Sequence, residues 1–91
     1  MQHYYAVAER DADGGFGITF PDRDGITAWA ENVAELVSQA QDALESVAMY
    51  GGKLPLSTEE GAKPPDDLSD FDQPAIVVVI PFEPAVSKAA A

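Results

Sequence analysis

Residues 15–25 read "GFGITFPDRDG", a strand that runs into a charged turn. Phe16, Ile18 and Phe20 alternate with smaller residues, which is the period-two pattern of a half-buried strand. Pro21 cannot donate a hydrogen bond to a neighbouring strand, so it ends this strand or lies at its edge. The next four residues, Asp-Arg-Asp-Gly, are typical of a turn, because the glycine permits a chain reversal.

Two further strands are predicted on either side of it. Residues 3–9, "HYYAVAE", alternate in a strand-like way, and the Asp-Gly-Gly at 13–15 is a hairpin signal between the two apolar runs. Residues 26–30, "ITAWA", indicate a short third strand after the turn. The three strands then form a meander with the second strand in the middle.

An amphipathic helix is predicted over residues 33–50. Asn32 precedes it as an N-cap, Glu35 stands at the capping-box position, and Gly51 and Gly52 follow where a left-handed C-cap is expected. Apolar residues recur at the helical spacing along one face: Val33, Leu36, Val37, Ala40, Leu44, Val47 and Ala48.

The rest of the chain is a long connection and a last strand. Residues 53–74 are rich in Pro, Asp, Glu and Gly, with one helical turn expected near Pro65 to Asp70. Residues 75–80, "AIVVVI", are typical of a strand covered on both faces. A right-handed crossover would place this strand beside the first and parallel to it.

These elements predict an α+β fold of the form β-β-β-α-β, with a four-stranded mixed sheet in the order 3-2-1-4 and one main amphipathic helix. The domain is expected to span residues 1–82, and residues 83–91 are expected to be a disordered tail or a truncated linker. One sheet face is left without a helix. Tyr4, Thr27 and Trp29 are expected to point away from the helix, which motivates the hypothesis that the chain self-associates through them.

Composition limits the partners. The 91 residues include 16 acidic and 5 basic ones, a net charge of -11, which repels phosphate backbones and attracts a basic partner. There is no cysteine, so thiolate chemistry is excluded. The N-terminus has no signal-peptide pattern, and the apolar run at 75–80 is too short to span a bilayer. We therefore expect a cytoplasmic chain with no membrane role.

Enzyme chemistry finds little support in the residues. His3 is the only histidine and has no companion nucleophile or acid, and the glycines at 14, 15 and 17 do not form a phosphate loop. The strand order resembles the ribonuclease H arrangement, whose nucleases hold metals with a carboxylate in the middle of the first strand. Residues 4–7 carry none. We expect no catalytic residue, no metal and no cofactor; the enzyme alternative is a divergent metal-dependent nuclease using Glu9, Asp22 and Glu31.

Together, these pieces resemble the HicB antitoxin family. The resemblance rests on Gly15 to Asp22 with Gly25 in place, followed by the helix "AELVSQAQDAL" at 34–44 and the final valine run, and it covers about residues 3–80. Two features depart from the family pattern. Arg23 and Asp24 replace a usual Leu-Pro, and Ile26 replaces a usual Cys.

The resemblance implies a toxin-neutralising domain with a degenerate, partial ribonuclease H-like fold and no nuclease activity. Its partner would be a small basic HicA-type toxin, an mRNA-cleaving ribonuclease, and the antitoxin would form dimers or higher oligomers. We expect partner binding at Asp22, Asp24, Glu31 and Trp29. DNA binding would need a C-terminal module that these residues do not include. An orphan oligomeric scaffold remains a third alternative.

Overall fold

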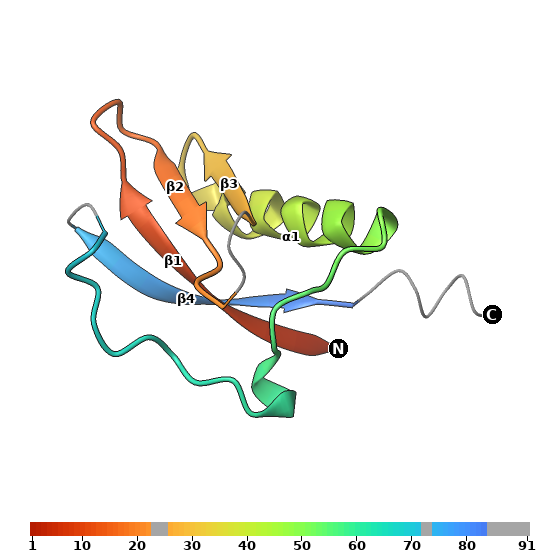
Figure 1. The fold of residues 1–91 in the computed structure, drawn as a ribbon. Helices are drawn as coiled ribbons and strands as arrows, with labels where there is room; N and C mark the ends of the chain where they lie inside the picture. Colours follow the sequence, from red (N-terminus) through yellow and green to blue (C-terminus); the bar gives the residue numbers. More distant parts are fainter. Residues whose placement is uncertain (23–25, 72–73, 84–91) are drawn as a thin grey trace.

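The computed structural model describes residues 1–22, 26–71 and 74–83. The turn at 23–25 and the predicted tail beyond residue 83 lie outside these described residues. The described chain forms four strands, one α-helix and one short 3-10 helix (Figure 1). In chain order these are β1 (Gln2–Arg10), β2 (Phe16–Thr19), β3 (Thr27–Ala30), α1 (Val33–Met49), η1 (Thr58–Glu60) and β4 (Ala75–Phe82).

The sheet has the order β3-β2-β1-β4, which confirms the predicted order and makes β1 and β2 the inner strands. The predicted direction of the last strand is wrong. β4 runs antiparallel to β1, with Gln2 opposite Phe82 and Glu9 opposite Ala75. The other two strand pairs are also antiparallel, so the sheet is antiparallel rather than mixed.

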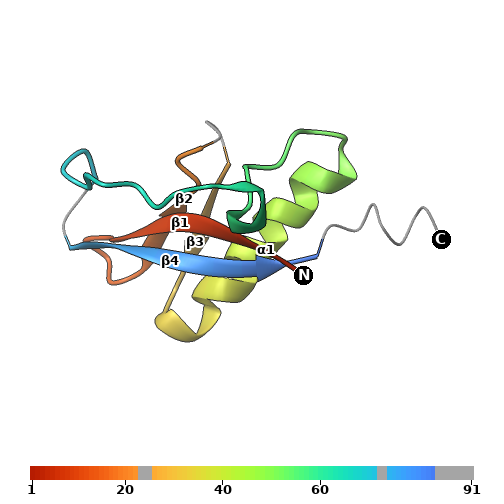
Figure 2. The same cartoon turned by 90° about the horizontal axis from the view of Figure 1, so that it is seen from below.

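The path of the connection between α1 and β4 explains this direction. Near its start, the hydroxyl of Ser57 donates to Oε1 of Gln2 (2.5 Å), at the beginning of β1. At its end, the carbonyl of Pro74 accepts a bond from the backbone N of Arg10 (3.1 Å), at the end of β1. The connection therefore travels the length of β1 before β4 begins, as the traces in Figures 1 and 2 show. The crossover rule applies only to connections between parallel strands, and β4 is antiparallel to β1.

α1 begins and ends as the sequence predicts. The side chain of Asn32 accepts a bond from the backbone N of Glu35 (3.1 Å). At the other end Gly51 has a φ of 75°, in the left-handed region, and Gly52 donates to the carbonyl of Val47 (2.9 Å). This is the Schellman arrangement, which satisfies carbonyls that the helix itself leaves unpaired. No helix in the described part of the chain is both long and apolar enough to cross a membrane.

The core lies between α1 and one face of the sheet. Its members come from all four strands, from α1 and from the segment after β2: Tyr4, Ala6, Ala8, Ile18, Phe20, Ile26, Ala30, Leu36, Ala40, Leu44, Ile80 and Phe82. The ring of Tyr4 meets that of Phe82 edge to face, with centroids 6.3 Å apart. Burial of these apolar groups is the main stabilising contribution to the fold.

Three burial predictions need correction. Tyr4 is 3% exposed and belongs to the core, so it is not on the open face where it was expected. Val33 and Val37, predicted on the packed face of the helix, are 69% and 40% exposed, because the buried stripe of α1 runs along Leu36, Ala40 and Leu44. β4 is not covered on both faces, since Ile76 and Val79 are about half exposed on this edge strand.

Candidate functional site

The sheet face opposite α1 carries a short cross-strand row of three residues. Glu9 of β1 pairs with Gly17 of β2, and Gly17 pairs with Trp29 of β3. Directly paired residues on antiparallel strands point to the same face. The next row, Ala8 with Ile18, faces the helix, so the row of Glu9, Gly17 and Trp29 faces away from it.

Trp29 is held across the β1–β2 hairpin. A Cβ atom placed on Gly15 would lie 2.3 Å from Cζ2 of the indole, so the ring can occupy this position only because residue 15 has no side chain. The indole Nε1 donates to Oδ2 of Asp11 (3.4 Å). The ring is thus packed on the hairpin, yet 47% of the residue is exposed. The ring is oriented by the fold and remains available to a partner.

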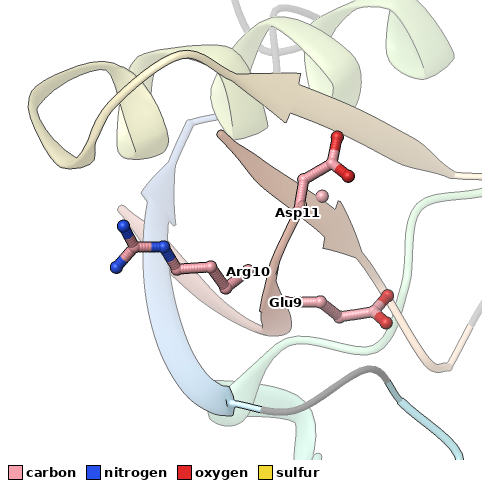
Figure 3. A pocket seen from close by; sticks show the side chains of 4 residues that line it. Glu9, Arg10 and Asp11 are labelled. Atoms are coloured by element: carbon pink, nitrogen blue, oxygen red, sulfur yellow. The ribbon is translucent and has the colours of Figure 1, made fainter. Parts of the chain in front are cut away.

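A small hollow lies next to Asp11, the residue that bonds the indole. Its volume is about 100 Å³, and Glu9, Arg10, Asp11 and Gly17 line it (Figure 3). A Cβ on Gly17 would meet no atom within 4 Å, so no protein atom fills the space above Gly17. In Figure 3 the side chain of Arg10 extends away from those of Glu9 and Asp11, and its guanidinium lies 5.8 Å from the ring centroid of Phe16. The carboxylates of Glu9 and Asp11 therefore border the hollow on the side away from the Arg10 guanidinium.

We call Glu9, Asp11, Gly15, Gly17 and Trp29 the acidic–aromatic patch. Its hollow holds the volume of about three water molecules. Pockets for metabolites are several times larger, at about 300–1,000 Å³. The patch therefore suits the end of one polar side chain better than a whole small molecule.

The structure separates the residues predicted to bind a partner. Trp29 lies in the patch, and Glu31 follows β3 at the same end of the sheet, where Phe16 pairs with Ala30. Asp22 follows β2 at the opposite end, where Thr19 pairs with Thr27. Asp24 lies outside the described residues.

The two remaining groups of predicted residues are also divided. Thr27 is exposed and lies on the same face of β3 as Trp29, whereas Tyr4 is in the core. For the nuclease alternative, Asp22 stands at the far end of the sheet from Glu9 and Glu31, so the three carboxylates do not converge. Within residues 1–22, 26–71 and 74–83, no group of three or more His, Asp or Glu side chains is placed to hold a metal.

Sequence reasoning missed the roles of Asp11 and Gly17. The sequence feature that could have revealed them is the hairpin between β1 and β2. Gly14 has a φ of 93°, and the backbone N of Asp11 donates to the carbonyl of Gly15 (2.8 Å). This turn pairs Arg10 with Phe16 and therefore Glu9 with Gly17. A register worked out from the Asp-Gly-Gly turn would have placed a carboxylate opposite a glycine on the open face.

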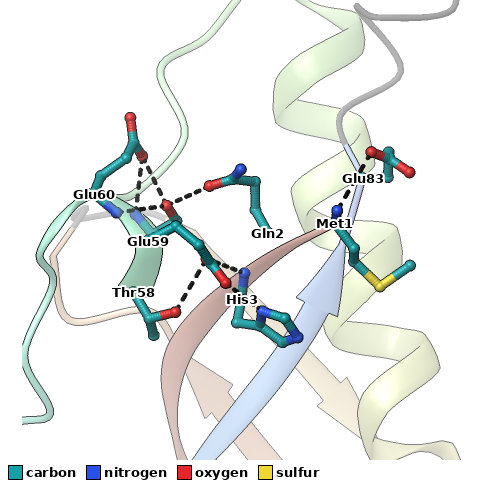
Figure 4. A network of polar contacts seen from close by, with 8 residues as sticks. Met1, Gln2, His3, Thr58, Glu59, Glu60 and Glu83 are labelled. Carbon is teal, nitrogen blue, oxygen red and sulfur yellow. Dashed lines mark hydrogen bonds and ion pairs between the residues drawn. The ribbon is translucent and has the colours of Figure 1, made fainter.

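A second polar cluster ties the long connection to the start of β1 (Figure 4). Glu59 accepts a bond from the backbone N of His3 (2.9 Å), and its other oxygen lies 2.6 Å from Nδ1 of the same residue. These bonds favour the ionised carboxylate, so His3 lowers the pKa of Glu59 to about 2. The only histidine thus has a carboxylate partner, which sequence reasoning did not find. The contact joins two parts of the chain and brings no nucleophile to the ring.

No protein-family model matches the sequence, and the curated proteins gave no significant match. Solved structures do match. One is a chain of a HicA3 and HicB3 toxin-antitoxin complex, with a TM-score of 0.57 and 23% identity, covering 90% of this chain and 99% of that one. The fold is that of HicB antitoxin structures.

Two further HicB structures support this likeness. The antitoxin HicB3 matches with a TM-score of 0.58 and 23% identity, over 91% of this chain. The N-terminal domain of the Burkholderia pseudomallei antitoxin HicB matches with a TM-score of 0.55 and 13% identity, over 89% of this chain and 98% of that domain. The chain spans 63% of the HicB3 chain, so the HicB likeness extends over part of that antitoxin.

Proposed function

We propose that this chain is the antitoxin of a type II toxin–antitoxin pair, and that it binds and blocks a small basic HicA-type mRNA-cleaving toxin. The observation that carries the proposal is the HicB fold, which covers about nine-tenths of the chain and includes a match within a toxin-antitoxin complex. The motif of residues 15–25 supports the same assignment.

The charge of the chain suits this role. A net charge of -11 attracts a basic protein and speeds the encounter, and it disfavours binding to the RNA that such a toxin cleaves. Neutralisation then requires only that the acidic protein cover the toxin's active site. The chain needs no catalytic group for this, and the carboxylates of the nuclease alternative do not converge.

The proposal also includes self-association and a cytoplasmic location. β4 is an edge strand of eight residues without a charged side chain, and Ile76 and Val79 are exposed on it. Such an edge can pair with a second copy. DNA binding would require a further module, because the acidic surface of these residues repels phosphates.

Co-expression tests the proposal. The proposal expects a neighbouring gene for a short basic protein, which is induced alone and then together with this chain. The proposal expects growth arrest alone, rescue by this chain, and co-purification of the two proteins in a fixed ratio. Arrest that this chain does not relieve, or a basic neighbour that never co-purifies with it, would overturn the proposal. Metal-dependent RNA cleavage by the pure chain would instead favour the nuclease alternative.

A further inference from the structure

We propose that the acidic–aromatic patch is the binding site, here called the seat, for one cationic side chain. This side chain is an arginine or lysine presented by a basic protein partner. The identity of that partner rests on the proposed function, whereas the chemistry of the seat rests on the patch alone. None of the residues expected from sequence to bind a partner, apart from Trp29, belongs to it.

The patch has a floor, an acidic side and an adjoining indole. Gly17 forms the floor, because it carries no side chain and has open space above it, whereas the Trp29 indole already covers Gly15. Glu9 and Asp11 supply carboxylates on the β1 side. Trp29 of β3 is paired with Gly17 and bonded to Asp11, so its exposed indole stands next to the hollow without lining it. A side chain that enters above Gly17 therefore meets the two carboxylates, with the indole beyond Asp11.

This combination favours a cation. Carboxylates attract a guanidinium or an ammonium group, and the face of tryptophan is the strongest aromatic partner for such a cation. The indole is already oriented by its packing on Gly15 and its bond to Asp11, so a partner loses little freedom in ordering it. Asp13 in the hairpin and Glu31 after β3 are exposed at the same end of the sheet and add to the negative field.

Other occupants fit less well. A metabolite needs a larger pocket than about 100 Å³. An anion would be repelled by Glu9 and Asp11. A second copy of this chain would bring another net charge of -11 to an acidic surface. A basic protein surface supplies both the required charge and a side chain of the right size.

The sharpest test fills the seat without disturbing the fold. Gly17→Val adds a side chain where nothing lies within 4 Å, and valine suits a strand better than glycine does. We expect this variant to unfold at the same denaturant concentration as the parent or a higher one. The same side chain occupies the hollow, so we expect it to weaken cation binding. Thr19→Val is the matched control, because it changes a residue of the same strand and adds no bulk to the hollow.

The probe is an acetylated and amidated hexa-arginine peptide, with hexa-glutamine as the neutral control. Trp29 is the only tryptophan, so its fluorescence reports on the seat directly. Amide chemical shifts map the binding surface. We expect salt-sensitive changes centred on Glu9, Asp11, Gly17 and the Trp29 indole. Changes spread evenly over the acidic surface, or equal binding by Gly17→Val, would overturn the proposal.

Charge variants provide a second, independent comparison. Glu9→Gln with Asp11→Asn keeps the shape of the patch and an oxygen acceptor for the Trp29 indole. Asp42→Asn with Glu45→Gln removes the same two charges from the exposed side of α1. We expect the first pair to weaken peptide binding about threefold to tenfold and the second pair to change it less than about twofold. Equal losses would indicate that only net charge matters.

The peptide experiment can fail separately from the proposed function. If Gly17→Val rescues growth and co-purifies with the basic protein as well as the parent chain does, the antitoxin role stands and the seat is wrong. If the peptide binds at the patch but no basic neighbour is neutralised, the seat stands and the toxin assignment is wrong.

Discussion

Ser57→Ala should loosen the long connection from the sheet and lower the stability of the whole domain. Ser57 is fully buried, and its hydroxyl contacts two residues, Gln2 and Glu60, and also lies 3.0 Å from Oε1 of Glu60. It accepts from the backbone N of Glu60 (3.2 Å) and donates to Oε1 of Gln2 (2.5 Å). The first bond caps η1, and the second joins η1 to β1.

The magnitude follows from these two bonds. Losing a serine N-cap costs about 1 kcal/mol. Leaving the partly buried carbonyl of Gln2 without its donor costs about 1 kcal/mol more. A loss of about 2 kcal/mol is a large share of the roughly 5–13 kcal/mol expected for a domain of this size. It should lower the melting temperature by about 8–16 °C.

Urea unfolding followed by circular dichroism measures this loss, and hydrogen exchange locates it. Amide protection should fall most at residues 57–61 and at the first residues of β1. Ser46→Ala is the matched control, because Ser46 is exposed on α1; it should change stability by less than about 0.5 kcal/mol. If Ser57→Ala lowers the free energy of unfolding by less than about 0.5 kcal/mol, this hydroxyl does not anchor the connection to β1.

Three other outcomes are expected. Asn32→Ala should lower the free energy of unfolding by about 1 kcal/mol in urea, whereas Asn32→Asp should preserve it, because only the alanine removes the cap of α1. The folded pKa of Glu59, about 2, lies below its ordinary value of 4.5, so its contact with His3 stabilises the fold above about pH 4.5 and is lost as the pH falls towards 2. Glu59→Gln should therefore be less stable than the parent at pH 7, and a difference that persists unchanged at pH 2 would contradict this. Val79→Lys should shift the chain towards monomer in light scattering if β4 pairs with a second copy, and a parent that is already monomeric would contradict self-association.

Local structure could be predicted from neighbouring residues. The hairpin, the three strands of the meander and α1 with both of its caps depend on side chains within a few positions of each other. The direction of β4 could not be predicted in this way. It depends on where a connection of about 25 residues returns to the sheet, and the anchors of that connection, Gln2 with Ser57 and Arg10 with Pro74, are remote in sequence.

Two misplacements have identifiable causes. In β1, Ala6, Val7 and Ala8 are all buried, so alternation did not reveal which face meets the helix, and Tyr4 was placed on the wrong one. The short helix of the connection lies at Thr58–Glu60, not near Pro65 to Asp70. Ser57 and Glu60 form a capping box that was visible in the sequence, whereas the prolines later in the connection do not start a helix in the structure.

The residues of the acidic–aromatic patch could also be predicted only in part from the sequence. Trp29 could be singled out as an aromatic residue on an exposed strand. Its neighbours Glu9 and Asp11 required the strand register, which had to be worked out from the Asp-Gly-Gly turn.

The pairing of the first strand with the last has a consequence during protein synthesis. β1 leaves the ribosome before β4, its partner along one edge, which begins at Ala75. At typical rates of about 5–20 residues per second, roughly 3–13 seconds separate the two strands. During this interval the meander and α1 can assemble, while one edge of β1 has no neighbour. A newly made chain is therefore open to strand exchange at β1 until its last strand has emerged.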